Sequence, residues 1–223
     1  MNRFISSTLA VVLVSFTLFM PQSAEARRVS LSGDFNPEFK GRKFSTFAIS
    51  AINTVPKFRF QFERRMHDLF KRHYNGKTNL VEFHKYGEPS KFNPGAEKMD
   101  RIKVIEDLKQ KKIEVLVLFN VHNQGGENLS DQMTLDEAIE ASINHKHDIS
   151  SVTRYVNSSV TLYEMSTGKI IWKGQGKLRA KINSRKWFKK SSKIQTVRLY
   201  RFIVKAGLLP PSYYDELHEE DGD

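Results

Sequence analysis

The sequence predicts an α/β domain, specifically an α+β sandwich built on a mixed sheet. Helical and extended patterns alternate along the chain, one segment is apolar throughout, and two long strands follow each other directly. The predicted order is β-α-β-α-β-β-β-α, with a long antiparallel C-terminal hairpin. The expected elements are strands at 44–50, 79–86 and 113–121, helices beginning near 56 and 96, the hairpin, and a last helix near 190–208.

The first helix follows Pro56 and carries an apolar stripe that is expected to face a core. The stripe consists of Phe58, Phe62, Met66, Leu69 and Phe70. Its charged residues are expected to lie mostly away from the core: Arg59, Glu63, Arg64, Asp68, Lys71 and Arg72. The second helix, over about 96–112, is expected to turn Met99, Ile102, Ile105 and Leu108 inward.

The segment "IEVLVLFNV" (113–121) is predicted to be a central strand. It lacks strict alternation of apolar and polar residues, which favours burial on both faces of a sheet. A polar excursion follows from His122 to about Ser150, with a short helix expected within "TLDEAIEASI" (134–143).

The hairpin centres on "LYEMSTGKIIWKGQG" (162–176). Alternation places even-numbered residues on an inner face and odd-numbered residues on an outer face. A three-residue turn at 166–168 keeps the faces matched, so Leu162 is expected to face Trp172, and Thr161 to face Lys173.

Three residues of this hairpin are assigned structural roles. Gly168 is expected to adopt the left-handed conformation that closes the turn. Trp172 is expected to pack inward, with ligand stacking as the alternative. Gly174 is expected to allow a helix or bulge to approach closely.

The composition of the N-terminal segment indicates export. Residues 1–26 are predicted to be a signal peptide, because a short positive start precedes an uncharged apolar run and small residues at Ala24 and Ala26. A membrane anchor is the alternative, although the run is near the short limit for spanning a bilayer. The remaining segments are an extended lead-in (27–43), a single domain (44–209) and an acidic flexible tail (210–223).

Cysteine is absent from the sequence. Its absence excludes disulfides, thiol catalysis, cysteine-ligated metals and a lipidation cysteine. A periplasmic location is therefore expected, with extracellular release as the alternative.

Basic residues accumulate toward the end of the chain. The net charge is +11, and between Met165 and Tyr214 there are 13 lysines and arginines and no acid. Behind a signal peptide this pattern indicates an acidic protein or anionic envelope material rather than nucleic acid. The predicted interaction surface comprises Tyr155, Tyr163, Lys173, Lys177, Arg179, Lys181, Arg185, Lys186, Trp187, Phe188, Lys189, Lys190, Arg198, Arg201 and Lys205.

The hairpin resembles that of small bacterial envelope proteins, often lipoproteins, of unknown function. Their hairpin reads roughly Asp-x-x-Thr-Gly-Lys-x-x-Trp-x-Gly; Glu164 stands in place of the acid, and Thr167, Gly168, Lys169, Trp172 and Gly174 match. The element order is similar to the TolB amino-terminal domain, CsgG and the penicillin-binding-protein activators. This resemblance implies a non-catalytic domain that works through protein contacts. The sequence differs from many of these proteins in lacking the lipidation cysteine.

Signs of catalysis are few. His145 and His147 could point the same way on an extended segment and bind zinc together with His122, but three or four converging ligands are needed. His73 is expected to be a satisfied residue at the edge of the apolar stripe. His67 is expected on the solvated side of its helix, and His84 in a strand without a nearby acid.

The sequence thus predicts a soluble, periplasmic, non-catalytic interaction or assembly protein without a cofactor. It would contact an acidic partner through a basic sheet face and the final helix. The alternative is a binder of lipopolysaccharide, acidic cell-wall polymer or lipid head groups. A metal-dependent hydrolase around His145 and His147 is the third hypothesis.

Overall fold

The computed structural model describes residues 31–91, 93–122, 133–144, 155–179 and 185–209. Their backbone forms one mixed six-stranded sheet in the order β1-β6-β5-β4-β2-β3. The strands are β1 (Leu31–Phe35), β2 (Phe47–Ile52), β3 (Leu80–Glu82), β4 (Val115–His122), β5 (Tyr155–Glu164) and β6 (Ile170–Arg179). The helices are η3 (Pro37–Phe39), α2 (Pro56–His73), η4 (Phe83–Lys85), α3 (Arg101–Gln110), α4 (Leu135–Ile143) and α5 (Arg185–Lys205).

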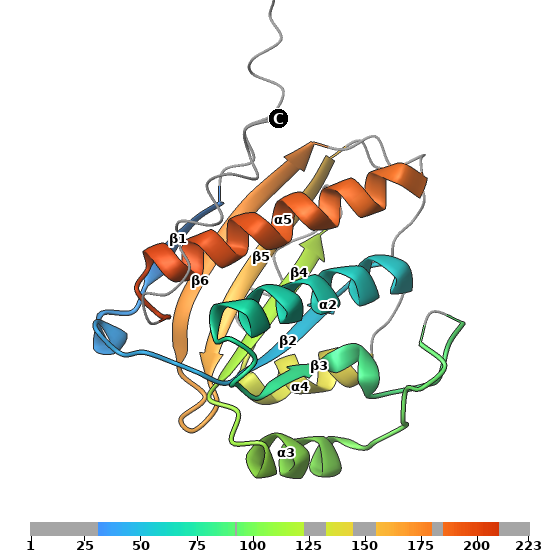
Figure 1. Cartoon of the computed structure of the whole chain (residues 1–223), viewed down its shortest axis with the longest axis horizontal. Coiled ribbons are helices and arrows are strands. Elements are labelled where there is room, and N and C mark those ends of the chain that lie inside the picture. The colour runs from blue at the N-terminus through green and yellow to red at the C-terminus, as the bar shows by residue number, and fades with distance from the viewer. Residues whose placement is uncertain (1–30, 92, 123–132, 145–154, 180–184, 210–223) are drawn as a thin grey trace, which may run out of the picture.

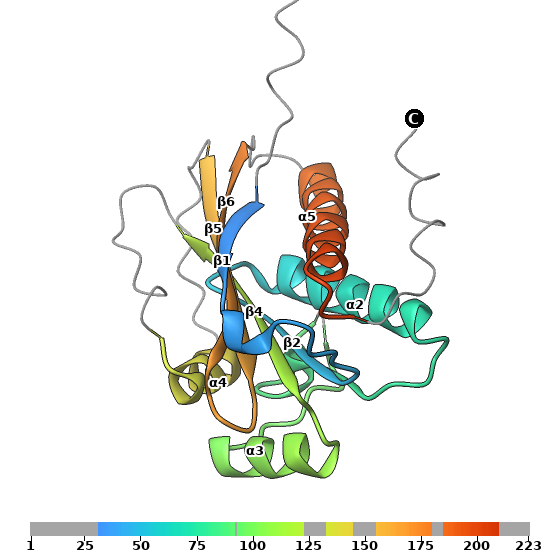
Figure 2. The same cartoon turned by 90° about the vertical axis from the view of Figure 1, so that its left-hand side faces the viewer.

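The predicted fold class is confirmed. β2 pairs in parallel with both β3 and β4, while β4, β5, β6 and β1 pair in antiparallel fashion. α2 and α5 lie side by side over one face of the sheet, and α4 lies on the opposite side (Figures 1 and 2). The sheet is therefore the middle layer of a three-layer arrangement.

Each face of the sheet has its own apolar core. Under α2 and α5, Phe62 and Phe119 stack with ring centroids 4.5 Å apart, as do Phe47 and Phe70 at 4.4 Å. Under α3 and α4, the second core includes Leu108, Leu116 and Ile139. As predicted, β4 is buried on both faces.

The last helix begins earlier than predicted, and the short helix within 134–143 is confirmed. The latter starts with a capping box, in which Thr134 and Glu137 each accept from the backbone N–H of the other. No helix within the described residues is both long and apolar enough to cross a membrane.

The second helix is shorter than predicted. The side chain of Asp100 accepts a hydrogen bond from the backbone N–H of Lys103, so α3 starts only at Arg101. In this short helix Val104 and Leu108 point into the second core, and Ile102, predicted to point inward, is 67% exposed.

The predicted strand 79–86 extends over only three residues, β3, before the chain tightens into η4. The backbone N–H of His84 is drawn away from a strand ladder because it donates to the buried carboxylate of Glu63 at 2.6 Å. This tertiary hydrogen bond ends the strand early.

The lead-in contributes an edge strand that the sequence pattern does not single out. β1 pairs with β6, placing Gly33 opposite Gly174 and Asp34 opposite Lys173. A Cβ atom at Gly33 would lie 2.2 Å from the carbonyl oxygen of Lys173 and 2.5 Å from Cα of Gly174. The two glycines thus permit the close approach that was predicted at Gly174, but the approaching element is the strand β1, and not the predicted helix or bulge.

The hairpin has the predicted pairing, with Leu162 opposite Trp172 and Thr161 opposite Lys173. The predicted three-residue turn is wrong by one residue: four residues separate Glu164 from Lys169, and the N–H of Glu164 donates to the carbonyl of Lys169. A register shift after Leu162 compensates for the extra residue, so the pairing further along the hairpin is the predicted one. Gly168 has φ +72°, and Trp172 is buried against Phe202 with ring centroids 3.9 Å apart.

Candidate functional site

The outer face of the hairpin is partly covered, which corrects one predicted surface residue. Tyr163 is 1% exposed within the second core, and its hydroxyl donates to the carbonyl of Met133 at 2.9 Å. Burial raises the pKa of Tyr163 to about 12. Tyr163 therefore holds Met133, just before α4, to the sheet and cannot serve as an exposed contact.

The predicted surface also divides between two layers. Lys173 lies on the opposite face of the sheet from Trp172, which packs against α5 through Phe202. The described basic residues of α5 and Lys173 of β6 are consequently separated by the sheet. Moreover, the fold places an acid, Asp34, directly across from Lys173.

Much of the predicted set lies outside the described side chains. These members are Tyr155, Lys177, Arg179, Lys181, Arg185, Lys186, Trp187, Phe188, Lys189 and Lys190, together with the metal candidates His122, His145 and His147. Among the side chains that are described, no group of three or more histidines or acids could hold a metal ion.

The structure adds α2 to the predicted basic surface, which did not include any residue of this helix. α2 and α5 pack side by side over one face of the sheet (Figure 1). Many of the positions of these two helices that are not buried are lysine or arginine. We call this set the basic helical surface. Its described members, none of them buried, are Lys57, Arg64, Arg65, Lys71, Arg72, Lys193, Arg198, Arg201 and Lys205.

A single exposed acid, Asp68, accompanies these nine cations on the described parts of the two helices. The other acid of α2, Glu63, is fully buried and turned toward the sheet. Like charges gathered on one side of a protein create a potential that attracts anions over a distance of about a Debye length. The spacing of Arg64, Asp68 and Lys71 on one side of α2 was visible in the sequence, but its proximity to α5 was not.

The opposite side of α2 carries a buried ion pair. Nε of Arg59 donates to Oε1 of Glu63 at 2.9 Å, one helical turn away, and neither side chain is more than 6% exposed. Nη2 of Arg59 donates to the carbonyl of Ser142 in α4 at 2.7 Å. The pair was predicted to face solvent; instead it joins α2 to α4 past the end of β2.

Glu63 also organises the start of η4. One carboxylate oxygen accepts from the backbone N–H of Ala51 at 2.9 Å, and the other lies 2.9 Å from Nδ1 of His84. Nε2 of His84 lies 3.2 Å from Glu82. His84 thus has acids on both sides, which contradicts the prediction of a histidine without an acid partner.

Burial alone raises the pKa of the Glu63 carboxyl. The Arg59 guanidinium, His84 and the Ala51 N–H outweigh this effect, so the net shift is a lowered pKa. Glu63 is therefore ionised at neutral pH. The sequence signal that could have revealed the pair is its position: Arg59 and Glu63 are four residues apart and adjoin Phe58 and Phe62 of the apolar stripe.

The first helix carries two histidines, and the prediction holds for His73. His73 is 3% exposed, and its Nδ1 lies 2.6 Å from the hydroxyl of Tyr200, so it is a satisfied residue between α2 and α5. His67, predicted on the solvated side, is only 22% exposed, and its Nδ1 lies 3.7 Å from the buried carboxylate of Glu82.

Comparison with known proteins adds little to this description. No protein-family model matches the chain, and neither does any curated protein. Solved structures that resemble it include two PelC dodecamers from Paraburkholderia phytofirmans. The first shares 10% sequence identity with this protein and has a TM-score of 0.40. The superposition covers 82% of this chain and 100% of the PelC chain. The second, a variant, has 8% identity and a TM-score of 0.39 with the same coverage. These values are too low to transfer any property.

Proposed function

We propose that the protein is a non-catalytic interaction protein of the bacterial envelope that binds an acidic protein partner through the basic helical surface. The observation that carries the proposal is the charge of that surface, where nine lysines and arginines accompany one exposed acid. The envelope location rests on the predicted signal peptide at 1–26.

The proposal revises the expected interface. α5 remains part of it, and α2 takes the place of the sheet face, because the sheet separates α5 from Lys173 and Asp34 adjoins that lysine. A protein partner is favoured over a flexible polymer since two packed helices present their charges in a fixed arrangement, which an equally ordered acidic surface can match.

The test is crosslinking capture from envelopes with two variants of equal net charge. Arg64→Glu/Lys193→Glu reverses two exposed cations of the basic helical surface, one on each helix. Lys103→Glu/Lys109→Glu reverses two exposed cations of α3, on the other side of the sheet. We expect the wild type and the α3 variant to capture the same partner, and the first variant to lose it.

Equal capture by all three proteins would rule out the basic helical surface as the interface. Cosedimentation with phosphatidylglycerol vesicles addresses the alternative partner. Binding to vesicles that disappears steeply with added salt, without a captured protein, would favour the anionic-material function instead.

A further inference from the structure

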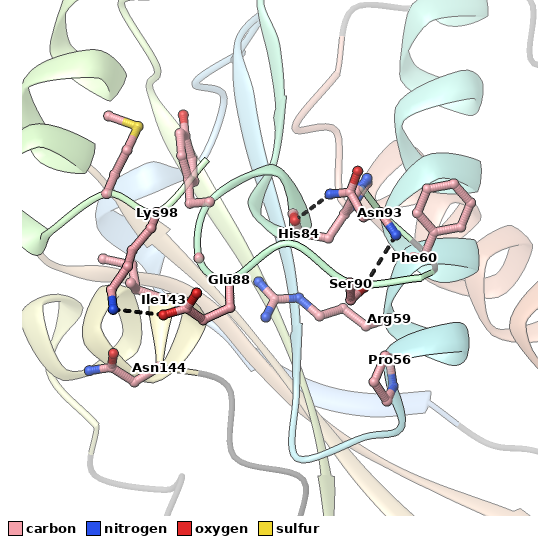
Figure 3. Close-up of a pocket in the computed structure, with 13 residues that line it drawn as sticks. Pro56, Arg59, Phe60, His84, Glu88, Ser90, Asn93, Lys98, Ile143 and Asn144 are labelled. Atoms are coloured by element: carbon pink, nitrogen blue, oxygen red, sulfur yellow. Dashed lines mark hydrogen bonds and ion pairs between the residues drawn. The ribbon is translucent and has the colours of Figure 1, made fainter. Parts of the chain in front are cut away.

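A pocket of about 390 Å³ opens beside the buried Arg59–Glu63 pair (Figure 3). It lies where the parallel strands β2 and β3 end, between the start of α2, the segment 86–99 and the end of α4. The crevice outside the carboxyl ends of parallel strands is a frequent ligand site in open α/β sheets. Its size is that of a small-molecule site.

Arg59 supplies a fixed cation to this pocket. Its Nε and Nη2 are held by Glu63 and by the carbonyl of Ser142, so the guanidinium cannot turn away. Within the described part of the chain, no group accepts a hydrogen bond from Nη1. Figure 3 shows the guanidinium directed into the pocket, where this third nitrogen is available to an anion.

Glu63 offsets the charge of Arg59 only in part. The same carboxylate also accepts from the backbone N–H groups of Ala51 and His84 and contacts the imidazole of His84. An arginine whose carboxylate is shared in this way retains positive potential on its open side. A second carboxylate on Nη1 would gain a charge-assisted hydrogen bond.

Two further features add positive potential at the same place. α2 begins at Pro56, which lines the pocket, and neither a capping side chain nor a first-turn acid neutralises that helix end. Lys98 lines the rim, where its ammonium lies 2.6 Å from Glu88. Both partners of this pair are largely exposed, so a ligand can compete for Lys98 at little cost.

Part of the remaining wall is apolar, beside polar lining residues such as Ser90, Asn93 and Asn144. Phe60, Met99 and Ile143 face the pocket, and Phe60 packs edge-on against the imidazole of His84. These side chains provide a surface for a hydrocarbon or aromatic body, while Arg59 fixes the acidic end. We propose that the pocket binds a small organic monocarboxylate, with its carboxylate on Arg59 and Lys98 and its apolar part against Phe60 and Met99. This site is separate from the basic helical surface, and neither proposal depends on the other.

The test uses 3-phenylpropionate and its uncharged analogue 3-phenylpropanamide, titrated into the full protein and followed by amide NMR shifts. We expect saturable shifts at residues 56–60 and 84–99 with the acid, and binding of the amide at least about tenfold weaker. Arg59→Gln should lose a similar factor. Lys98→Gln should weaken binding several-fold, and Lys103→Gln, an exposed change on α3, should leave it unchanged.

Should Arg59→Gln fail to fold, Lys98→Gln and the acid–amide comparison decide the matter, since Lys98 lies on the surface. Equal binding of acid and amide would overturn the proposal. Shifts confined to residues outside the pocket, or no saturation up to the solubility limit of 3-phenylpropionate, would overturn it as well.

Discussion

Glu63 is the residue on which most of the polar structure at the end of β2 depends. Its two oxygens serve Arg59, Ala51 and His84, which belong to a helix, a strand and a turn. Removing one partner of a buried ion pair costs more than the pair itself contributes, because the other charge stays buried without compensation. Loss of the Glu63 charge would therefore affect three elements together.

We predict that Glu63→Gln lowers the free energy of unfolding by about 3–5 kcal/mol at neutral pH, measured by urea denaturation. The control is Glu106→Gln, an exposed change on α3 that should have almost no effect. A loss for Glu63→Gln no greater than that of the control would show that the buried pair is not stabilising.

The effect of Glu63→Gln on the unfolding free energy should depend on pH. Since the folded pKa of Glu63 lies below its ordinary value of 4.5, its stabilising contribution is present above that value and is lost as the pH falls through the folded pKa. The difference in unfolding free energy between wild type and Glu63→Gln should accordingly shrink as the pH is lowered below 4.5. A constant difference would contradict the lowered pKa.

At the scale of elements, β1 is joined to the sheet at a place that tolerates no side chain. We predict that Gly33→Ala destabilises the protein by about 1–3 kcal/mol, because the new methyl group would meet the backbone of Lys173 and Gly174. In this variant, the amide hydrogens of β1 should exchange faster than in the wild type, and the increase should be larger in β1 than in the other strands. Gly95→Ala, where an added Cβ meets open space, is the matched control, and equal effects of the two would contradict the close pairing.

The elements were predictable where one local pattern decides them. Alternation places Leu162 opposite Trp172, and the apolar run defines β4 as central. What covers the other side of an element is not a local property. The burial of Tyr163 depends on α4, which packs there only in the folded chain.

The candidate site was less predictable for the same reason. Glu63 and His84 are 21 residues apart and meet only because α2 returns the chain to β3 beside β2. A charged residue within an amphipathic helix is usually solvated, so Arg59 was assigned to the wrong side. Only the i, i+4 spacing of Arg59 and Glu63 gave a hint of the pair.

At the scale of the whole molecule, charge is unevenly distributed over the described surface, with nine cations and one exposed acid on the described parts of α2 and α5. We predict that Arg64→Glu/Lys193→Glu elutes from a sulfonate cation-exchange column at lower salt than Lys103→Glu/Lys109→Glu, although both carry the same net charge. A protein that binds a charged column through one face responds to the charges on that face more than to its net charge. Identical elution would indicate that the basic helical surface does not dominate the field of the protein.

The pairing of β1 with β6 has a consequence for how the chain folds. The side-chain amide of Asn36, just after β1, donates to the carbonyl of Ile170 in β6, 134 residues further along the chain. β1 can therefore pair only after β6 has been synthesised. Contacts between such distant segments are costly to form early in folding, because a long loop must be closed. We expect β1 to dock after the folding transition state, so that Gly33→Ala accelerates unfolding and leaves the folding rate nearly unchanged.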